Sequence, residues 1–209
     1  MEKKDIKDLI KEVFSEYCKR FSDLLGSNLG FKPWDNAWKD NNRRSIHESN
    51  QVSKFLEVYR EKAPVSSKVI TWMELPVKID DKTNHIDGFI ADTERKNIFF
   101  IEAKRYSRKG NLDSLGKDVN RSKEIIKTKT SNNIKTFKGL NICDYNIYVL
   151  CLVDIWEEKS SWTKDIVARW DSCDNYFSQE CLDSEKQIIE GLDQKYYLGY
   201  HLLRCKDGD

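Results

Sequence analysis

The sequence lacks the features that mark membrane-bound and exported proteins. None of its apolar runs approaches the roughly 20 residues that a membrane-spanning helix needs. The N-terminal stretch MEKKDIKDLIKEVF has the pattern of an amphipathic helix and no apolar core of a signal peptide. We therefore expect a protein without a membrane partner that works in the cytoplasm.

Signatures of zinc binding, nucleotide binding and covalent catalysis are also missing. The six cysteines include no CxxC pair, and in a reducing compartment they do not predict a disulfide framework. The chain contains no Gly-rich phosphate loop and no serine or cysteine nucleophile motif. Charged residues make up 34% of the chain, and they are the remaining candidates for a functional site.

Breakpoints between domains are scarce. Three prolines and nine glycines are spread over 209 residues, and no repeat or low-complexity linker appears. A chain of this length can form one domain with a substantial hydrophobic core. We predict a single domain over residues 1–209.

Charge is unevenly distributed along the chain, although the net charge is only +1. Residues 95–138 carry thirteen Lys or Arg and four Asp or Glu, a net charge of +9, whereas residues 139–209 have a net charge of −7. A basic block of this kind is found on phosphate-binding surfaces and also on ordinary solvated helix faces. Charge alone does not separate these two interpretations.

Hydrophobic spacing predicts helices and strands that build a sheet with helices packed on it. The predicted helices cover residues 5–25, 45–61, 111–130, 162–177 and 179–192. The predicted strands cover residues 69–79, 85–92, 97–106, 146–156 and 196–204. Short connections predict an antiparallel meander of the first three strands, and the apolar run 146–156 predicts a strand covered on both faces. The order ααβββαβααβ indicates an α/β (α+β) fold with a central mixed sheet flanked by helices.

One predicted strand ends in two opposite charges. In FFIEAKR, at 99–105, three bulky apolar residues lead into Glu102, and Lys104 follows two residues later. Side chains alternate across a strand, so Phe100, Glu102 and Lys104 share one face. The acid-x-Lys spacing recurs elsewhere, but only here does it end a strongly apolar strand. Burying either charge is costly unless it is paired or bound to a cation. The motif therefore predicts either a site or an ion pair at an exposed strand tip.

Two further acids are predicted to approach this motif. Asp87 lies in the apolar run IDGFI on the preceding strand, where a meander makes it a neighbour of Glu102, and Gly88 beside it permits close approach of a backbone or ligand. Glu48, on the helix 45–61, shares a face with three apolar residues, Val52, Phe55 and Tyr59. Glu48 also follows Ser45 at the spacing of a helix cap, so it has two candidate roles.

Three carboxylates and one ammonium group in one place suit the hydrolysis of a phosphodiester. Carboxylates bind Mg²⁺ through oxygen, and the metal polarises a phosphate and lowers the pKa of a bound water. A lysine in the same site positions that water or stabilises developing charge. We therefore expect Mg²⁺ as a cofactor, with Mn²⁺ as a substitute.

The sequence D-G-F-I from Asp87, followed fifteen residues later by I-E-A-K around Glu102 and preceded by a glutamate on a helix, resembles the PD-(D/E)xK nuclease superfamily. Restriction endonucleases and repair nucleases belong to this superfamily. Ile86 stands where the family pattern has proline. The resemblance implies a restriction-endonuclease-like core over about residues 45–155, with the N-terminal helix, the C-terminal helices and the last strand packed on it.

The same resemblance implies a Mg²⁺-dependent endonuclease that acts on nucleic acid, with DNA the expected substrate. Asp87 and Glu102 would ligate the metal, and the backbone carbonyl of Ala103 would add a ligand. Lys104 would orient the attacking water, and Glu48 would complete or support the metal shell. Nearby basic residues would contact phosphates: Arg105, Lys117, Arg121 and Lys123. A homodimer is also suggested, because many relatives cut both strands as dimers.

Other interpretations stay open at this stage. The same fold without catalysis would be a module that binds nucleic acid or a protein partner. A Glu102 side chain in water would instead favour a different enzyme or a structural protein. Glu74, on the strand 69–79, is a lesser candidate for the site. The three histidines, His47, His85 and His201, show no ligand spacing, although the first two lie next to site elements.

Overall fold

The computed structural model of the chain describes residues 5–26, 48–63, 68–79, 82–106, 109–127, 144–157, 161–168, 181–190 and 195–204. Over these ranges the chain forms a mixed α/β fold with a six-stranded sheet and four helices, which confirms the predicted class. None of the helices in these ranges is long and apolar enough to span a bilayer.

The sheet has the strand order β1-β2-β3-β4-β6-β5 and contains parallel and antiparallel pairs. The strands β1 (Val69–Ile79), β2 (Lys82–Asp92) and β3 (Asn97–Tyr106) form the predicted antiparallel meander. The strand β4 (Asn146–Trp156) lies parallel to β3, and α3 (Lys109–Lys127) lies in the connection that such a pair requires. Antiparallel pairing adds β6 (Tyr196–Arg204) and then β5 (Cys181–Ile189).

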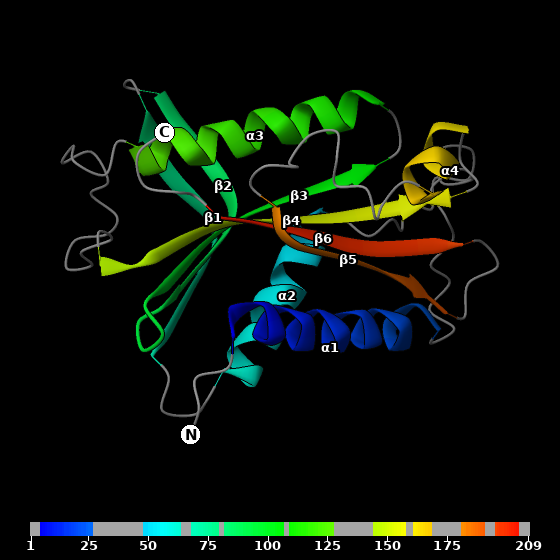
Figure 1. The fold of residues 1–209 in the computed structure, drawn as a ribbon, viewed down its shortest axis with the longest axis horizontal. Coiled ribbons are helices and arrows are strands. Elements are labelled where there is room, and N and C mark those ends of the chain that lie inside the picture. Colours follow the sequence, from blue (N-terminus) through cyan, green and yellow to red (C-terminus); the bar gives the residue numbers. More distant parts are fainter. Residues whose placement is uncertain are drawn as a thin grey trace.

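Helices cover both faces of this sheet (Figure 1). The helices α1 (Ile6–Gly26) and α2 (Glu48–Lys62) lie on one face, and α3 and α4 (Ser161–Ala168) lie on the other. Phe99 and Ile101 belong to the hydrophobic cluster on the α1 and α2 side, whereas Phe100 belongs to the cluster on the α3 side. The predicted alternation along β3 is therefore confirmed. Residues 147–155 of β4 are all buried, as expected for a strand covered on both faces.

One predicted helix is wrong. Residues 181–189, within the range 179–192 that spacing assigns to a helix, form the edge strand β5. This strand pairs with β6 and packs beside α1, and Asp183 accepts a 2.7 Å hydrogen bond from the Tyr200 hydroxyl. These long-range partners outweigh the local helical pattern. The observed order is ααβββαβαββ.

The remaining helix predictions hold with small changes. The helices α1, α2 and α3 lie within a few residues of their predicted ranges. Near the end of α1, Leu24 is 37% exposed and the adjacent Leu25 is buried. The helix α4 covers residues 161–168 and so agrees with the first part of the predicted range 162–177. Residues 169–180 and residues 27–47, which include Ser45 and His47, lie outside the described residues.

The β1–β2 hairpin bends sharply where it passes the centre of the sheet (Figure 1). Glu74 has a φ of 52°, in the left-handed region that residues other than glycine rarely adopt. The ladder with β2 pairs the residues on either side of Glu74 but omits Glu74 itself, whose partner would be Asp87. Met73 packs on the α1 and α2 side of the sheet, whereas Leu75 packs on the α3 side. The part of the hairpin beyond the bend, residues 75–79 and 82–86, therefore lies toward α3.

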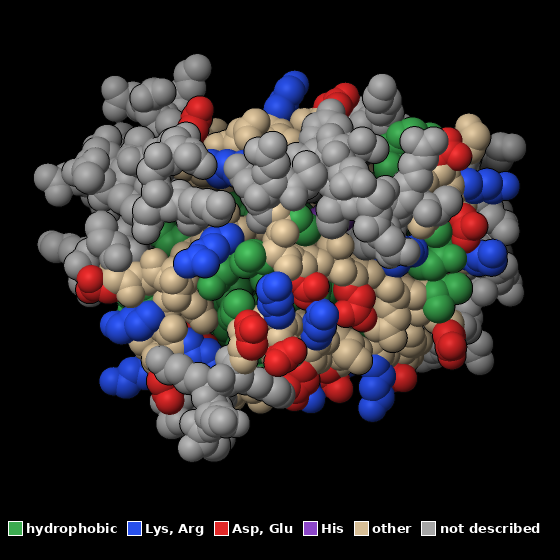
Figure 2. Space-filling view, viewed as in Figure 1, with side chains coloured by type: hydrophobic (Ala, Val, Ile, Leu, Met, Phe, Trp, Pro, Cys, Tyr) green, Lys and Arg blue, Asp and Glu red, His purple; other side chains and the backbone are tan. Residues whose placement is uncertain are grey.

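The surface over α1 and α2 is electrically mixed. Figure 2 shows acidic and basic side chains interspersed on this face. Arg20 contacts three glutamates on the two helices, Glu16, Glu57 and Glu61. Exposed pairs of this kind contribute little stability each. Among the described side chains of α1 and α2, charges of opposite sign therefore lie next to one another.

Candidate active site

Strands β2 and β3 separate midway along their length. Their ladder ends at the pair Gly88–Ile101. Beyond that pair β3 continues beside β4, whereas β2 continues beside β1. The two strands therefore form a fork beneath α3, which can be followed in Figure 1. The first residues past the last pair are Asp87 on β2 and Glu102 on β3.

The Asp87 carboxylate bridges the fork. The ladder pair between Asp87 and Glu102 that a regular meander predicts is absent. Instead, Asp87 Oδ2 accepts a 2.8 Å hydrogen bond from the backbone N–H of Ala103. Burial raises the pKa of Asp87, and the Ala103 N–H and the Lys104 charge oppose that rise. A side chain thus takes the place of the missing ladder bond and stays fixed against β3.

Gly88 brings α2 against the fork. A Cβ added at Gly88 would lie 2.5 Å from Cγ1 of Val52, so only glycine allows this approach of helix to strand. Glu48 is one helical turn before Val52 on α2. Close packing at Gly88 therefore sets the first turn of α2 beside β3.

Glu48 reaches across to β3. Its Oε1 accepts a 3.2 Å hydrogen bond from the backbone N–H of Arg105, and its Oε2 lies 3.8 Å from Nζ of Lys104. The structure thus brings Glu48 to the Glu102–Lys104 strand, as the apolar face of its helix predicts. The alternative role, a cap involving Ser45, falls on a residue outside the described ranges.

Glu102 is fully buried beneath α3. Its two carboxylate oxygens lie 3.1 Å and 3.3 Å from Nη2 of Arg121, and Oε1 also accepts a 3.0 Å hydrogen bond from the Ser122 hydroxyl. Burial, followed by the neighbouring charge of Asp87, raises the pKa of Glu102 to about 8. The alternative of an exposed Glu102–Lys104 ion pair is therefore wrong. Glu102 is not in water, and its salt bridge is to Arg121.

Lys104 is held by an acid that sequence analysis misses. Lys104 Nζ lies 3.1 Å from Asp118 Oδ2, and Asp118 Oδ1 lies 3.1 Å from Nη1 of Arg121. Burial opposes the charged form of Lys104, but Asp118 and Glu48 outweigh it and raise the pKa of the ammonium group. The missed signal is helical spacing: Asp118 lies three residues after Leu115 and four before Ser122, both buried on the face that α3 turns to the sheet.

Acids outnumber cations in this cluster, which we call the fork cluster. It contains four carboxylates and two cations: Glu48, Asp87, Glu102 and Asp118 with Lys104 and Arg121. With all four acids ionised its formal charge is −2. Burial, and after it the neighbouring acids, raises the pKa values of Asp87 and Glu102. A divalent cation would balance this charge, and carboxylate oxygens are the donors that Mg²⁺ takes.

The described side chains of the fork cluster do not form a complete metal site in their present positions. Among the described residues, no three His, Cys, Asp or Glu side chains are grouped closely enough to hold a metal ion as they stand. Asp87 and Glu102 lie close enough for the charge of Asp87 to raise the pKa of Glu102. Glu48 and Asp118 instead face Lys104. Cation binding at the fork therefore requires a rearrangement of side chains. The carbonyl of Ala103 as a ligand stays a prediction.

The basic residues predicted to contact phosphates lie in different settings. Arg105 is only 13% exposed in its side chain, and its Nε donates a 2.9 Å hydrogen bond to the buried Asp154. Gln51 of α2 donates to the other oxygen of Asp154 at 2.7 Å, so Arg105 is part of a buried polar network. On α3, Lys117 is exposed and Lys123 half-buried. Phosphate contact by any of these residues stays a prediction.

The lesser candidates lie in different places. The Glu74 side chain is exposed. Its backbone forms the hairpin bend opposite Asp87. His85 is exposed on β2. His201 is buried in β6 beside Cys151 of β4, and burial lowers its pKa to about 4.

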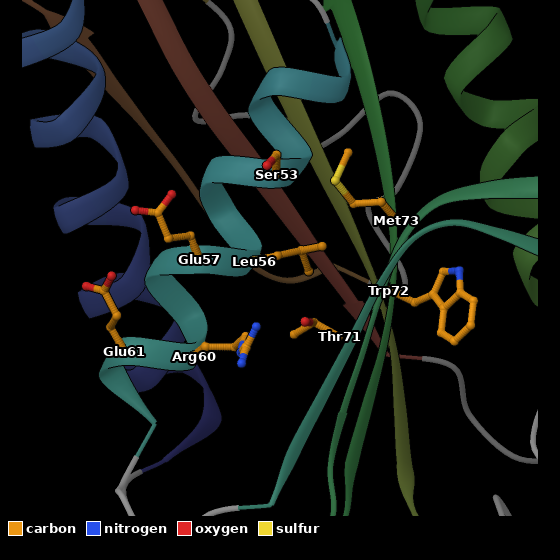
Figure 3. Close-up of a pocket in the computed structure, with 8 residues that line it drawn as sticks. All are labelled: Ser53, Leu56, Glu57, Arg60, Glu61, Thr71, Trp72 and Met73. Carbon is orange, nitrogen blue, oxygen red and sulfur yellow. The ribbon is translucent and has the colours of Figure 1, made fainter.

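A hollow of about 580 Å³ lies elsewhere, between α2 and β1. Figure 3 shows Thr71 and Met73 turned toward α2, whereas Trp72 points away from it. Its two acids, Glu57 and Glu61, already pair with Arg20. This hollow brings no set of converging donors together, so the fork cluster is the better candidate for a reactive site.

Comparison with protein-family models, with curated proteins and with solved structures found no match to this chain.

Proposed function

We propose that the chain is a Mg²⁺-dependent nuclease with a restriction-endonuclease-like fold of the PD-(D/E)xK type, and that it hydrolyses phosphodiester bonds in DNA. The observation that carries this proposal is the fork cluster. Asp87 and Glu102 are the first residues past the end of a ladder, Lys104 follows on the same face of β3, and Glu48 approaches from α2. Glu102 is fully buried and Asp87 half-buried, and two neighbouring acids in such a place are costly unless a cation offsets their charge.

Asp87 and Glu102 are the residues that would hold the metal. Both are oxygen donors, both lie at the fork, and each has a raised pKa because burial and neighbouring acids disfavour its charge. That donor set fits a hard divalent cation. When bound, Mg²⁺ would polarise the phosphate and lower the pKa of a bound water.

Lys104 acts as a cation in this proposal. Its Nζ lies 3.1 Å from Asp118 and 3.8 Å from Glu48, which keep it protonated. A protonated lysine donates hydrogen bonds and stabilises developing negative charge, and it does not accept a proton. Lys104 therefore orients the attacking water or a phosphate oxygen, and the proton of the water must leave by another group.

Asp118 is a positioning residue, because it acts through Lys104. Its two oxygens hold Lys104 and Arg121 at 3.1 Å each. Without Asp118, the Lys104 side chain would lose its closest partner. The helix α3 thus supplies the second half of the site, while the strands supply the first.

The test is a cleavage assay with supercoiled plasmid and with single-stranded and double-stranded DNA and RNA, in Mg²⁺, Mn²⁺ or EDTA. We expect cleavage that needs the metal and disappears in Asp87→Asn, Glu102→Gln and Lys104→Ala. Glu94→Gln, in the exposed β2–β3 turn, is the control and should cleave like the parent chain. Undiminished cleavage in all three site variants, or none by the parent chain on any substrate, contradicts the proposal.

A further inference from the structure

Arg121 binds the same carboxylate that a metal at the fork would need. Its Nη2 lies 3.1 Å and 3.3 Å from the two oxygens of Glu102, so both oxygens face one guanidinium nitrogen. Glu102 is fully buried, and it also accepts a hydrogen bond from the Ser122 hydroxyl. A buried carboxylate with these neighbours has little room for a second cation while Arg121 stays in place.

The Arg121 guanidinium is imperfectly satisfied in this position. Its Nε is buried and has no hydrogen-bond partner among the described residues. A buried donor left unpaired costs free energy, and arginine normally uses its planar fork of donors in paired contacts. The contact with Glu102 therefore neutralises charge without giving Arg121 its best geometry.

Asp118 provides a second hold on Arg121. Asp118 Oδ1 lies 3.1 Å from Nη1 of Arg121, and this contact is on α3 itself, three residues earlier in the same helix. If Arg121 left Glu102, Asp118 would keep the guanidinium at the edge of the fork. Arg121 is 27% exposed in its side chain, so part of it already borders solvent.

We infer that Arg121 is an exchangeable counter-charge: it neutralises Glu102 in the metal-free protein and gives up this carboxylate when a divalent cation binds. This inference rests on the proposed function, because it assumes that Glu102 is a metal ligand. Two positive charges on one carboxylate repel each other, so Arg121 and the cation compete for Glu102. The released guanidinium, still tied to Asp118, then presents free donors to a phosphate group of the substrate.

The competition has a measurable consequence. Removing the Arg121 charge should make cation binding tighter, whereas removing a contact that merely supports the fold should make it weaker or leave it unchanged. We expect Arg121→Gln to bind Mn²⁺ roughly three- to tenfold more tightly than the parent chain, because a partly exposed ion pair no longer has to be broken. Arg121→Lys keeps the charge and should bind about as the parent chain does.

The experiment is calorimetric titration of the full chain with Mn²⁺ alone, without nucleic acid. Lys164→Gln is the matched control, because it removes one positive charge at an exposed position of α4, on the same side of the sheet. Its Mn²⁺ affinity should equal that of the parent chain. Equal or weaker binding by Arg121→Gln overturns the inference, and so does equal tightening in Lys164→Gln, which would indicate a general charge effect.

A second measurement uses the unmodified protein, in case Arg121→Gln does not fold. The side-chain Nη–H signals of Arg121, identified in ¹⁵N NMR spectra by their loss in Arg121→Lys, should shift and exchange faster with water when Mg²⁺ is added. Unchanged signals under saturating Mg²⁺ overturn the inference. If the parent chain binds no divalent cation at all, the proposed metal site fails together with it. Binding without tightening or signal change defeats only the role of Arg121.

Discussion

Ala103 donates its backbone N–H to the Asp87 carboxylate across the point where β2 and β3 separate, at 2.8 Å. The hydrogen bond gives Asp87 a fixed position that depends on the backbone of the same strand that carries Glu102. Because the backbone of β3 is also paired with β4 throughout this stretch, the acid on β2 is set relative to a rigid reference. Substitutions at the site are therefore of two kinds: some change its charge and others change its geometry.

Asp87→Asn changes the charge and keeps an acceptor for the Ala103 N–H. We expect the fold to persist and divalent cation affinity to fall by at least about tenfold. Mg²⁺ binds only the native state, so it should raise the melting temperature of the parent chain and not that of Asp87→Asn. Scanning calorimetry with and without Mg²⁺ measures this difference. Asp165→Asn, exposed on α4, should respond to Mg²⁺ like the parent chain.

Asp118→Asn should act through Lys104. Because Asp118 raises the pKa of Lys104, its removal lowers that pKa, and protonated Lys104 is lost at a lower pH. We expect cleavage to fall by about 10- to 100-fold and the alkaline limb of its pH profile to move to lower pH. A role of Asp118 in folding alone would reduce activity without moving that limb. An unmoved limb therefore contradicts the positioning role.

Glu102→Gln should stabilise the metal-free protein at neutral and alkaline pH. The folded-state pKa of Glu102, about 8, lies above its ordinary value, so the folded state binds more protons than the unfolded state between these two values. Stability then decreases as pH rises from about 4.5 to about 8. Glutamine carries no charge, so the variant should show a flatter dependence and gain on the order of 1–3 kcal/mol near pH 8. Urea unfolding at several pH values measures this.

Glu94→Gln is the matched control for that series, because Glu94 is exposed in the β2–β3 turn. Its unfolding free energy should follow the parent chain at each pH. A Glu102→Gln variant that is less stable than the parent chain at pH 8 would show that the ionised carboxylate is well compensated by Arg121 and Ser122. In that case the excess negative charge assigned to the fork cluster is overstated.

Gly88→Ala should disturb the geometry of the site without touching its charges. The added methyl would lie 2.5 Å from Val52 and 3.3 Å from Ile101, so α2 must move away from β2. We expect a loss of about 1–3 kcal/mol in unfolding free energy. Val52→Ala in the same chain removes the closest atom, so the double variant should lose less than the two single losses combined. Additive losses would show that the two residues do not limit each other.

Glu74→Gly should relieve backbone strain at the hairpin bend. Glu74 has a φ of 52°, which costs a residue with a Cβ about 1 kcal/mol or more and costs glycine little. We expect the variant to keep or gain stability in urea unfolding. Lys96→Gly, at a φ of 56° in the β2–β3 turn, is the matched comparison at a site away from the fork. A clear loss of stability at Glu74→Gly alone would mean that its side chain contributes more than its backbone costs.

Most of the fold follows from local patterns that can be recognised in the sequence. The predicted bounds of β1, β3, β4 and β6 agree with the structure because each strand is an uninterrupted apolar or alternating run. β5 is different: its residues 181–189 mix charged, polar and apolar side chains, and its strand form depends on β6 beside it. The sequence of residues 181–189 alone therefore does not predict that they form a strand.

The site was partly predictable for the same reason. Alternation places Glu102 and Lys104 on one face of β3, and helical spacing turns Glu48 toward the sheet. The helical pattern of α3 is defined by its apolar residues, and an acid on that face, Asp118, looks like an interruption of the pattern. The partners of Glu102 could not be predicted either, since Arg121 and Ser122 meet it only after α3 crosses the sheet.

The bend at Glu74 has a consequence for how copies of this chain can meet. β1 is an outer strand of the sheet, and an outer strand with regular geometry invites pairing with a strand of another molecule. Here the left-handed backbone of Glu74 interrupts the strand halfway along, and Pro76, two residues later, has no N–H to donate. A second strand would find only short stretches of β1 to pair with, Val69–Met73 being one of them. The same backbone distortion that lies opposite Asp87 therefore also limits how far two sheets could join along this edge.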